Sequence, residues 1–576
     1  PEYEVLESDD LVHTGRLIPI YPLTEGLGAR TVRRLVKDAV DHWSNKAPDF
    51  MPPDVAKRNR LMPLTTAIQQ IHYPDTEECK EQARRRLAFD ELLLLQLSVM
   101  AKRRDWQGDQ PGHPMTSEGG RLDRFLSSLP FSLTTAQQRV LREILADMAG
   151  ARPMSRLLQG EVGSGKTVIA AAAAVVAVSC GFQAAIMAPT EILAEQHFRS
   201  ISALLARVAK PKPEEELVHT YSSFLDRPIS VALLTGSVRK SDKNALQQRI
   251  QRGEIDIIIG THALLQEGVE FQRLGLAIVD EQHRFGVLQR SALRQKGFNP
   301  HLLVMTATPI PRTLALTLYG DLELSVIDQL PPGRQSIKTK WVGPDKRERA
   351  YEFLREQVQS GRQAFIICPL IEESEAIEAR AAVAEYERLA TQVFRDLRLG
   401  LLHGRMTPSE KDATMRRFRD GELDILVSTA VVEVGIDVPN ATVMMVEGAD
   451  RFGLSQLHQF RGRVGRGVHK SYCLLLSDAL SADVRERLTI LERTDDGFKL
   501  AEEDLKLRGP GEFFGTRQSG LPDLRLARLS DIELMEMAHR EAVALSEADP
   551  WLKKPAHRLL AQEVSRAGVK GEGDLS

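Results

Sequence analysis

The segment Gly160–Thr167 (GEVGSGKT) constrains the fold of this 576-residue chain more than any other segment. It follows an apolar stretch and precedes an alanine-rich run, Val168–Val178, which is predicted to be a helix. Glycines between a strand and a helix let backbone N–H groups converge on phosphate oxygens. The pattern therefore predicts a parallel-sheet domain with a phosphate-binding loop.

Each position of this loop has a predicted role. Gly160, Gly163 and Gly165 allow the backbone to approach the phosphates closely. Lys166 is expected to reach the β- and γ-phosphates of ATP, and the Thr167 hydroxyl to ligate Mg²⁺.

Two carboxylates, Asp280 and Glu281, close an apolar run that is predicted to be a strand. Open parallel sheets bind ligands at the carboxyl ends of their strands. We expect Asp280 to hold Mg²⁺ and Glu281 to activate the attacking water. An acidic pair at a strand end is more often a cap or turn, and it is the phosphate loop upstream that favours catalysis.

Gln137 lies shortly before the phosphate loop, in the segment Phe131–Gln137. A glutamine amide can pair with the donor and acceptor edges of adenine, so Gln137 is a candidate for adenine recognition. In the alternative, Thr134 simply caps the following helix.

A third motif, Gln459–Arg466 (QFRGRVGR), lies far downstream. Arginine accelerates phosphoryl transfer when it meets the charge that develops on the γ-phosphate. Gln459, Arg463 and Arg466 are therefore candidates for the ATP site, with Arg463 and Arg466 as catalytic arginines. The alternative is a basic surface helix.

Composition limits the class of protein. The length indicates three or four domains, and the net charge of −3 with a pI near 6.6 excludes a uniformly basic nucleic-acid binder. The four cysteines form no C-x-x-C pair, which argues against zinc or disulfides and favours a reducing cytoplasm. The longest apolar run is too short to span a bilayer. Because the chain opens at Pro1, we expect an N-terminal truncation.

Short apolar runs bounded by turn residues recur along the chain and indicate buried strands of two α/β parallel sheets in tandem, divided near 331–333. The runs of the first sheet are 184–188, 231–234, 256–259, 276–280 and 302–305, and those of the second are 364–368, 398–402, 425–428, 443–446 and 472–476.

The segment Ala83–Lys102 has helical periodicity, and its leucines are predicted to be core. For Arg84–Arg86, a solvated helix face and a phosphate contact both remain open. The predicted domains are 1–115 (helical linker), 116–330 and 331–480 (the two sheets), and 481–576 (C-terminal helices and a glycine-rich loop).

The ordered motifs resemble those of superfamily 2 helicases, and the flanking segments resemble the RecG family of bacterial ATP-dependent DNA helicases. The resemblance covers essentially the whole chain. Its most specific segments are 1–4 (PEYE), 15–27 (GRLIPIYPLTEGL), 83–96 (ARRRLAFDELLLLQ), 280–290 (DEQHRFGVLQR) and 507–520 (LRGPGEFFGTRQSG).

The resemblance implies two RecA-like motor domains and a set of residues that touch DNA or couple it to ATP. In the first domain these are Thr190, Thr235, Gly236, Thr261, Gln282, His283, Thr306 and Thr308. In the second domain His403 and Arg405 would contact DNA, and Gly435 and Asp437 would line the ATP cleft. A hairpin of about 483–507 and a loop containing Glu512, Arg517 and Gln518 would push along duplex DNA.

The implied activity is ATP-driven translocation on double-stranded DNA that remodels branched DNA such as stalled forks and Holliday junctions. The implied partners are branched duplex DNA and single-strand-binding protein, without a membrane, for a monomer in the bacterial cytoplasm and nucleoid. We expect the family's N-terminal wedge domain to be represented here only by sequence resembling its exit. A fragment of a transcription-repair coupling factor and an inactive DNA-binding module remain alternatives.

Overall fold

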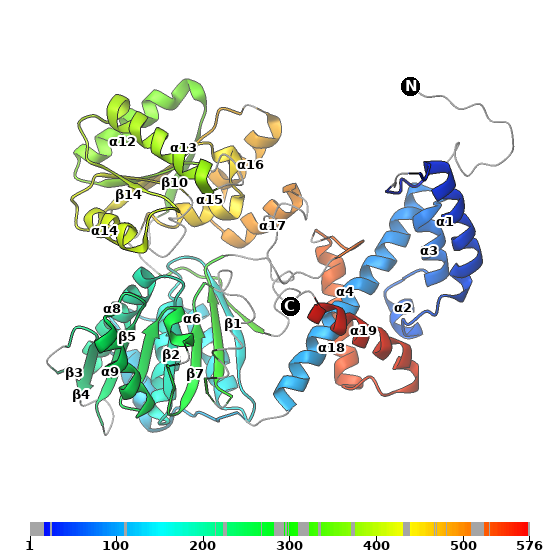
Figure 1. Ribbon diagram of the computed structural model, residues 1–576, viewed down its shortest axis with the longest axis horizontal. Helices are drawn as coiled ribbons and strands as arrows, with labels where there is room; N and C mark the ends of the chain where they lie inside the picture. Colours follow the sequence, from blue (N-terminus) through cyan, green and yellow to red (C-terminus); the bar gives the residue numbers. More distant parts are fainter. Residues whose placement is uncertain are drawn as a thin grey trace. The chain divides into compact units, whose positions relative to one another are not determined.

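The computed structural model describes most of the chain, and residue contacts divide it into two units (Figure 1). One unit takes its described residues from 1–106 and 509–576, and the other from 107–311 and 322–508. The described residues are 17–22, 26–108, 112–212, 215–222, 227–266, 268–281, 293, 296–297, 299–308, 322–331, 336–369, 375–429, 438–465, 467, 469–479, 481–508, 524–528 and 530–573.

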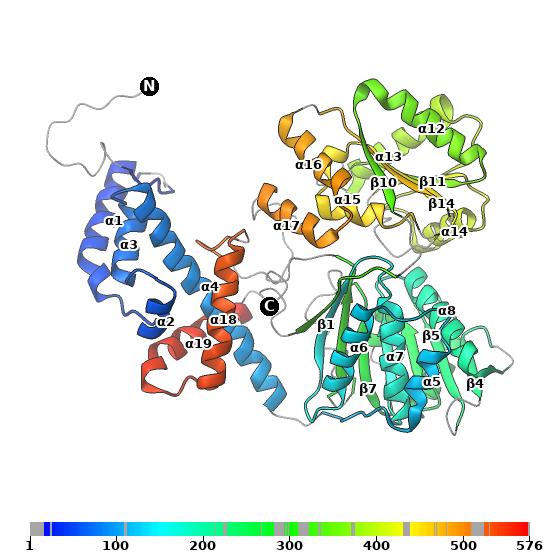
Figure 2. The same cartoon turned by 180° about the vertical axis from the view of Figure 1, so that it is seen from behind.

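The first unit is helical and brings together segments from both ends of the chain. Helices α18 and α19 lie alongside α4 in both views (Figures 1 and 2). The carboxylate of Glu91 on α4 accepts hydrogen bonds from the backbone N–H groups of Leu526 and Ala527, which precede α18. The helices of this unit are α1 (Ala29–Trp43), α2 (Pro53–Arg58), α3 (Leu64–His72), α4 (Glu77–Gly108), α18 (Ile532–Ala548) and α19 (Arg558–Gly573).

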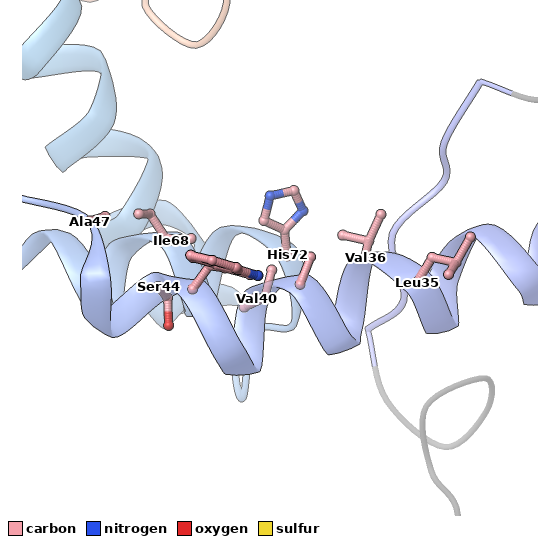
Figure 3. Close-up of a pocket in the computed structure, with 9 residues that line it drawn as sticks. Leu35, Val36, Val40, Ser44, Ala47, Ile68 and His72 are labelled. Carbon is pink, nitrogen blue, oxygen red and sulfur yellow. The ribbon is translucent and has the colours of Figure 1, made fainter.

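Helices α1 and α3 of this unit border an apolar groove. Figure 3 shows Val36 and Val40 of α1 and Ile68 and His72 of α3 around it. The ring of His72 is fixed there by a 2.8 Å hydrogen bond between its Nδ1 and the hydroxyl of Tyr21.

A buried ionic cluster stabilises α4, and it overturns both alternatives for Arg84 and Arg86, whereas Arg85 is exposed, as a solvated helix face predicts. The side chain of Arg86 is 1% exposed; its Nε donates to Asp90 at 2.9 Å and its Nη2 to Asp49 at 2.6 Å. Arg84 pairs with Asp531 at 2.8 Å. Neither a solvated face nor a phosphate contact describes Arg84 or Arg86, because carboxylates distant in sequence already neutralise both guanidinium groups. The prediction that the leucines are core holds for Leu92, Leu93 and Leu97.

The first sheet of the second unit has nine strands in the order β3-β4-β5-β6-β2-β7-β8-β1-β9. Strands β3, β4 and β5 pair antiparallel and the remaining pairs are parallel. Its strands are β1 (Ser155–Gly160), β2 (Gln183–Met187), β3 (Lys210–Pro211), β4 (Val218–Ser222), β5 (Ile229–Leu234), β6 (Ile257–Gly260), β7 (Leu274–Val279), β8 (His301–Thr306) and β9 (Glu323–Ile327).

One face of this sheet packs on the helix that follows the phosphate loop. Every residue of Val168–Val178 in that helix is buried, as expected for a helix that is apolar on all sides. Figure 2 shows α6 and α7 over the sheet, and their buried side chains share one core with its strands. The helices of this domain are α5 (Arg121–Ser127), α6 (Thr135–Met148), α7 (Lys166–Ser179), α8 (Glu191–Val208) and α9 (Lys240–Gln251).

The second sheet has six parallel strands in the order β10-β15-β14-β11-β13-β12. Alternate side chains of its strands enter two different cores, one with α12 and one with α14 and α15. Its strands are β10 (Ile337–Val342), β11 (Gln363–Ile367), β12 (Leu399–Leu402), β13 (Ile425–Ser428), β14 (Ala441–Val446) and β15 (Ser471–Leu476), and its helices are α12 (Arg347–Gln359), α13 (Glu375–Arg388), α14 (Pro408–Arg419) and α15 (Leu454–Arg461).

A helical hairpin completes the second sheet's core. Its helices are α16 (Ala482–Arg493) and α17 (Gly497–Arg508), and both agree with the hairpin predicted near 483–507. Leu488, Leu491 and Leu500 are 0% exposed and pack in the core that contains α14 and α15. All ten predicted strands are present. Among the described residues, no helix has both the length and the apolar character needed to cross a membrane.

The variant Arg86→Ala is expected to lower the free energy of unfolding by about 3 kcal/mol or more, because it leaves the buried Asp90 without its partner. Burial already raises the pKa of Asp90 to about 7, against the opposing charge of Arg86. A carboxyl with a raised pKa stabilises the fold at low pH and loses that contribution as pH rises. The loss of unfolding free energy caused by Arg86→Ala should therefore be smaller at about pH 5 than at about pH 8.

Chemical denaturation measures this change, with Arg85→Ala as the matched control on the same helix. Arg85 is exposed, so its replacement should stay within about 0.5 kcal/mol of the parent chain. Equal effects of the two variants would show that the buried cluster contributes nothing.

Candidate active site

The predicted site residues of the first domain lie at one edge of its sheet. Parallel pairing aligns β1, β2, β5, β6, β7 and β8, so their carboxyl ends meet at the same edge. These ends lead into the predicted residues Gly160, Thr190, Thr235, Thr261, Asp280 and Thr306.

The phosphate loop has the backbone conformation that only glycine adopts without strain. Gly163 and Gly165 have φ of 82° and 91°, and Gly165 is the N-cap of α7. A Cβ at Gly160 would lie 2.6 Å from Ser164 Oγ. Lys166 Nζ donates to the carbonyl oxygens of Gly160 at 2.7 Å and Glu161 at 3.1 Å. The loop backbone therefore curves around the Lys166 ammonium group, at the N-terminus of a buried helix.

Gln137 supports this loop from α6. Its Nε2 donates to the Ser164 carbonyl at 2.8 Å, and its Oε1 accepts from the Thr134 N–H at 2.9 Å. Thr134 Oγ1 in turn accepts from the Gln137 N–H, which completes a capping box. The capping alternative is thus present in the structure, and adenine recognition by Gln137 stays a prediction.

Asp280 is fixed by His197, a residue that the sequence analysis did not single out. The Nε2 of His197, on α8, donates to Asp280 Oδ2 at 2.7 Å, and the N–H of Glu281 donates to Oδ1 at 3.0 Å. Burial alone would raise the pKa of Asp280, but the contacts with His197 and the charge of Lys166 hold it below its usual range. Asp280 is therefore an anionic group that interacts with the charge of Lys166 in the phosphate loop.

Glu281 has the opposite electrostatic environment. Burial and the neighbouring charge of Asp280 raise its pKa, while the charges of Lys166 and Arg463 oppose the rise. A carboxylate with a raised pKa is the stronger base. Its backbone φ is 53°, a strained conformation for a residue with a side chain, and such strain is typical of functional sites.

A chain of amide and hydroxyl groups joins the two sheets at this site. Gln159 Nε2 at the end of β1 donates to the Thr308 carbonyl at 3.2 Å, and Gln459 Nε2 on α15 donates to Thr308 Oγ1 at 2.8 Å. The N–H of Thr308 donates to the buried Thr306 Oγ1 at 3.2 Å. The predicted coupling residues Thr306 and Thr308 thus lie between the phosphate-loop strand and the arginine motif.

Arg463 follows α15 and is 3% exposed. Its positive charge lowers the pKa of Glu281, so the two groups share one electrostatic environment. Arg461 of the same motif is also buried but faces the hairpin, where its Nη1 donates to the carbonyls of Leu491 and Thr494. The motif therefore divides its arginines between two tasks, and its sequence pattern predicted only the first.

The predicted DNA-contacting residues of the first domain differ in exposure. Thr190 caps α8, and Gly236 is exposed, but Thr235 and Thr261 are 3% and 1% exposed. The exposed groups next to these two threonines are Ser237 and His262. Contacts with DNA by these loops stay a prediction.

His403 and Arg405 follow β12 in the second domain. His403 is partly buried, and burial together with the charge of Lys411 lowers its pKa, while Arg405 is exposed. The other predicted site residues lie outside the described residues: Gln282, His283, Gly435, Asp437, Arg466, Glu512, Arg517 and Gln518.

Known families match the two motor domains and the C-terminal region. A DEAD/DEAH box helicase model matches 134–317, a helicase conserved C-terminal domain model matches 345–468, and a model of RecG domain 3, C-terminal, matches 494–570. A curated relative from Bacillus subtilis, named ATP-dependent DNA helicase RecG, is 46% identical over 97% of this chain and 79% of its own length.

The chain belongs to the RecG family. A second RecG relative, from Synechocystis sp., is 49% identical over 96% of this chain. The chain spans 65% of that relative's length. A solved structure of RecG bound to a three-way DNA junction has a TM-score of 0.72 and 42% identity, and it covers 91% of this chain and 66% of that one. The two sheets are tandem RecA-like helicase domains, as predicted, and these matches do not support a coupling-factor fragment.

The described residues of this RecG-family chain fit a nucleoside triphosphate with Mg²⁺. A Cβ at Gly160 or Gly165 would collide with Ser164 or Gln137, so glycine is needed for the tight loop whose backbone N–H groups would face the phosphates. The ionised Asp280 and the Thr167 hydroxyl are oxygen ligands of the kind that Mg²⁺ prefers. When bound, the metal ion would neutralise phosphate charge. Lys166 would neutralise further charge, and Glu281 would accept a proton from water.

The variant Gln137→Ala tests adenine recognition. If the amide reads adenine, KM for ATP should rise about fivefold, the effect of losing one hydrogen bond, while KM for GTP changes less. Steady-state hydrolysis of the two nucleotides measures the difference. Thr134→Ala is the control, because it removes the helix cap and keeps the Gln137 amide. A similar loss with both nucleotides would assign Gln137 to capping alone.

Proposed function

We propose that the chain is the motor of an ATP-dependent DNA helicase that translocates on double-stranded DNA and remodels branched DNA, such as stalled forks and Holliday junctions. The RecG-family membership supports this function, as does the resemblance to a RecG structure with a three-way DNA junction. Branch remodelling is energetically feasible, because opening a base-pair step costs about 1.4 kcal/mol and reannealing on the other arm returns it.

The observation that carries this proposal is the hydrogen-bonded chain from Gln159 through Thr308 to Gln459. Through this chain, Gln459 of the arginine motif bonds to Thr308, which also accepts from Gln159 at the end of the phosphate-loop strand. Arg463 then shares the electrostatic environment of Glu281 and Lys166. Such a site requires both domains, so hydrolysis depends on their relative position and can drive a cyclic movement.

Each residue has a proposed part in hydrolysis. Lys166 binds the β- and γ-phosphates, while Thr167 and Asp280 bind Mg²⁺. Glu281 activates water, and Arg463 stabilises the developing charge. His197 keeps the Asp280 carboxylate ionised and oriented, as a partner to a metal-binding group does.

The proposed partner is duplex DNA with a branch, and single-strand-binding protein is a further candidate partner. We place a monomer in the bacterial cytoplasm at the nucleoid. The loops at the carboxyl edge offer backbone N–H groups and small polar side chains, which suit contact with phosphates without reading bases.

Steady-state ATP hydrolysis by this chain tests the proposal, with linear single strands, linear duplex and a model fork as separate activators. Fork DNA should stimulate ATP hydrolysis more than linear duplex does, and linear duplex should stimulate it more than single strands do. Lys166→Ala should lower the stimulated rate about 100-fold or more, because it removes a group that stabilises phosphate charge.

The control is Lys240→Ala, an exposed lysine at the start of α9, which should leave hydrolysis unchanged. A parent chain that binds DNA and hydrolyses no ATP would support the inactive DNA-binding module instead. Equal stimulation of ATP hydrolysis by fork and linear duplex would contradict the preference for branched DNA. The chain would then be a translocase on duplex DNA without that preference.

A further inference from the structure

One side chain of the phosphate loop, Glu161, contacts the helical hairpin directly. Glu161 follows Gly160, and 15% of its side chain is exposed. Its Oε1 accepts a hydrogen bond of 2.8 Å from the N–H of Gly497, the first residue of α17. A loop of the first sheet therefore holds the start of a helix that belongs to the second sheet's core.

The contact satisfies a chemical need of the helix. The first N–H groups of a helix have no acceptor within it, and they attract negative charge. Asp496 Oδ1 accepts from the N–H groups of Phe498 and Lys499, at 3.0 and 3.3 Å. The N–H of Gly497 is directed to Glu161, so a carboxylate from another domain completes the first turn of α17.

Position 497 has no room for a larger residue. A Cβ there would lie 2.5 Å from His458 Nε2 and 3.0 Å from Glu161 Oε1. The His458 ring and the Glu161 carboxylate therefore both pack directly against the backbone of Gly497. Glycine thus allows the phosphate loop, α15 and α17 to approach one another at a single point.

His458 forms the third side of this contact. Its Nδ1 lies 2.7 Å from Arg461 Nη2, and its Nε2 lies 3.5 Å from Glu161 Oε1. A guanidinium can only donate, so Nδ1 accepts and the ring hydrogen lies on Nε2, facing the carboxylate. The orientation of His458 toward Glu161 is therefore fixed by Arg461.

Arg461 connects this contact to the other hairpin helix. Its Nη1 donates to the carbonyls of Leu491 at 2.9 Å and Thr494 at 3.0 Å, at the end of α16. A cation is favourable at a helix C-terminus, where carbonyl groups lack partners. The turn between α16 and α17 is thus held by Arg461 from one side and by Glu161 from the other.

The backbone of Glu161 contacts the catalytic lysine of the proposed function. Its carbonyl oxygen accepts from Lys166 Nζ at 3.1 Å and from the Ser164 N–H at 3.0 Å. Glu161 therefore contacts Lys166 through its backbone and the hairpin through its side chain. Glu161 thus connects the loop that contains Lys166 to the hairpin.

We propose that Glu161 is a positioning residue that transmits the state of the phosphate loop to the α16–α17 hairpin. The inference rests on the proposed function, in which ATP hydrolysis drives movement along DNA. The contact is made in one relative position of the two sheets, so the loop and the hairpin bias one shared equilibrium. Without it, ATP hydrolysis continues and is used less efficiently for DNA movement.

The test measures, in one reaction with the full chain, the ATP hydrolysed and the model fork converted. Glu161→Ala should lower the conversion per ATP about fivefold or more, within the usual range of coupling between sites. Glu161→Gln should retain most of the fork conversion per ATP, because its amide oxygen still accepts a hydrogen bond from the Gly497 N–H. A merely structural role of position 161 would not separate conversion from hydrolysis in this way.

Two further variants complete the design. Gly497→Ala disturbs the same contact from the hairpin side. It should lower the fork conversion per ATP as Glu161→Ala does. This variant tests the proposal even if Glu161→Ala prevents ATP hydrolysis. Glu502→Gln is the matched control, because it removes an exposed carboxylate from the same helix. Its ratio should equal that of the parent chain.

The outcomes separate the two proposals. A parent chain that neither hydrolyses ATP with DNA nor converts the fork contradicts the proposed function, and the inference falls with it. A parent chain that does both, with unchanged ratios in Glu161→Ala and Gly497→Ala, overturns the inference alone.

Discussion

The parallel pairing of β1 with β8 and of β2 with β7 determines where the chemistry of the first domain lies. Parallel strands direct their carboxyl ends to one edge, so residues far apart in sequence meet there without any further device. The phosphate loop, Asp280 and the Thr306–Thr308 segment are each continuations of such a strand. Their proximity follows from the strand order, and side-chain contacts then set their ionisation.

Burial and charge give the two neighbouring carboxylates different chemistry. Asp280 is kept ionised by His197 and Lys166, whereas burial and the charge of Asp280 raise the pKa of Glu281. A metal-binding group and a base need these opposite properties. They arise at adjacent positions because His197 donates a hydrogen bond to Asp280, and the resulting negative charge of Asp280 lies next to Glu281.

Local sequence signals predicted the fold well. Each of the ten apolar runs that we predicted to be strands is a strand in the structure. The glycine pattern correctly located the phosphate loop between β1 and α7. Both predictions succeed because strands buried on both faces and tight loops have distinctive local compositions. Partners across long separations left no such trace. His197 is 83 residues from Asp280, and Glu161 is 336 residues from Gly497. Arg86 was misjudged partly for the same reason: Asp90 is four residues away on the same helix, but Asp49 is 37 residues away in another segment, which the helix pattern does not reveal.

The hairpin leucines have a consequence for how the motor can be divided. Leu488, Leu491 and Leu500 fill the core beneath α14 and α15, so the hairpin is part of the second sheet's globule and not an appendage to it. A chain cut between β15 and α16 would leave that core open to water and prone to aggregation. The hairpin therefore folds as one unit with the sheet that it covers.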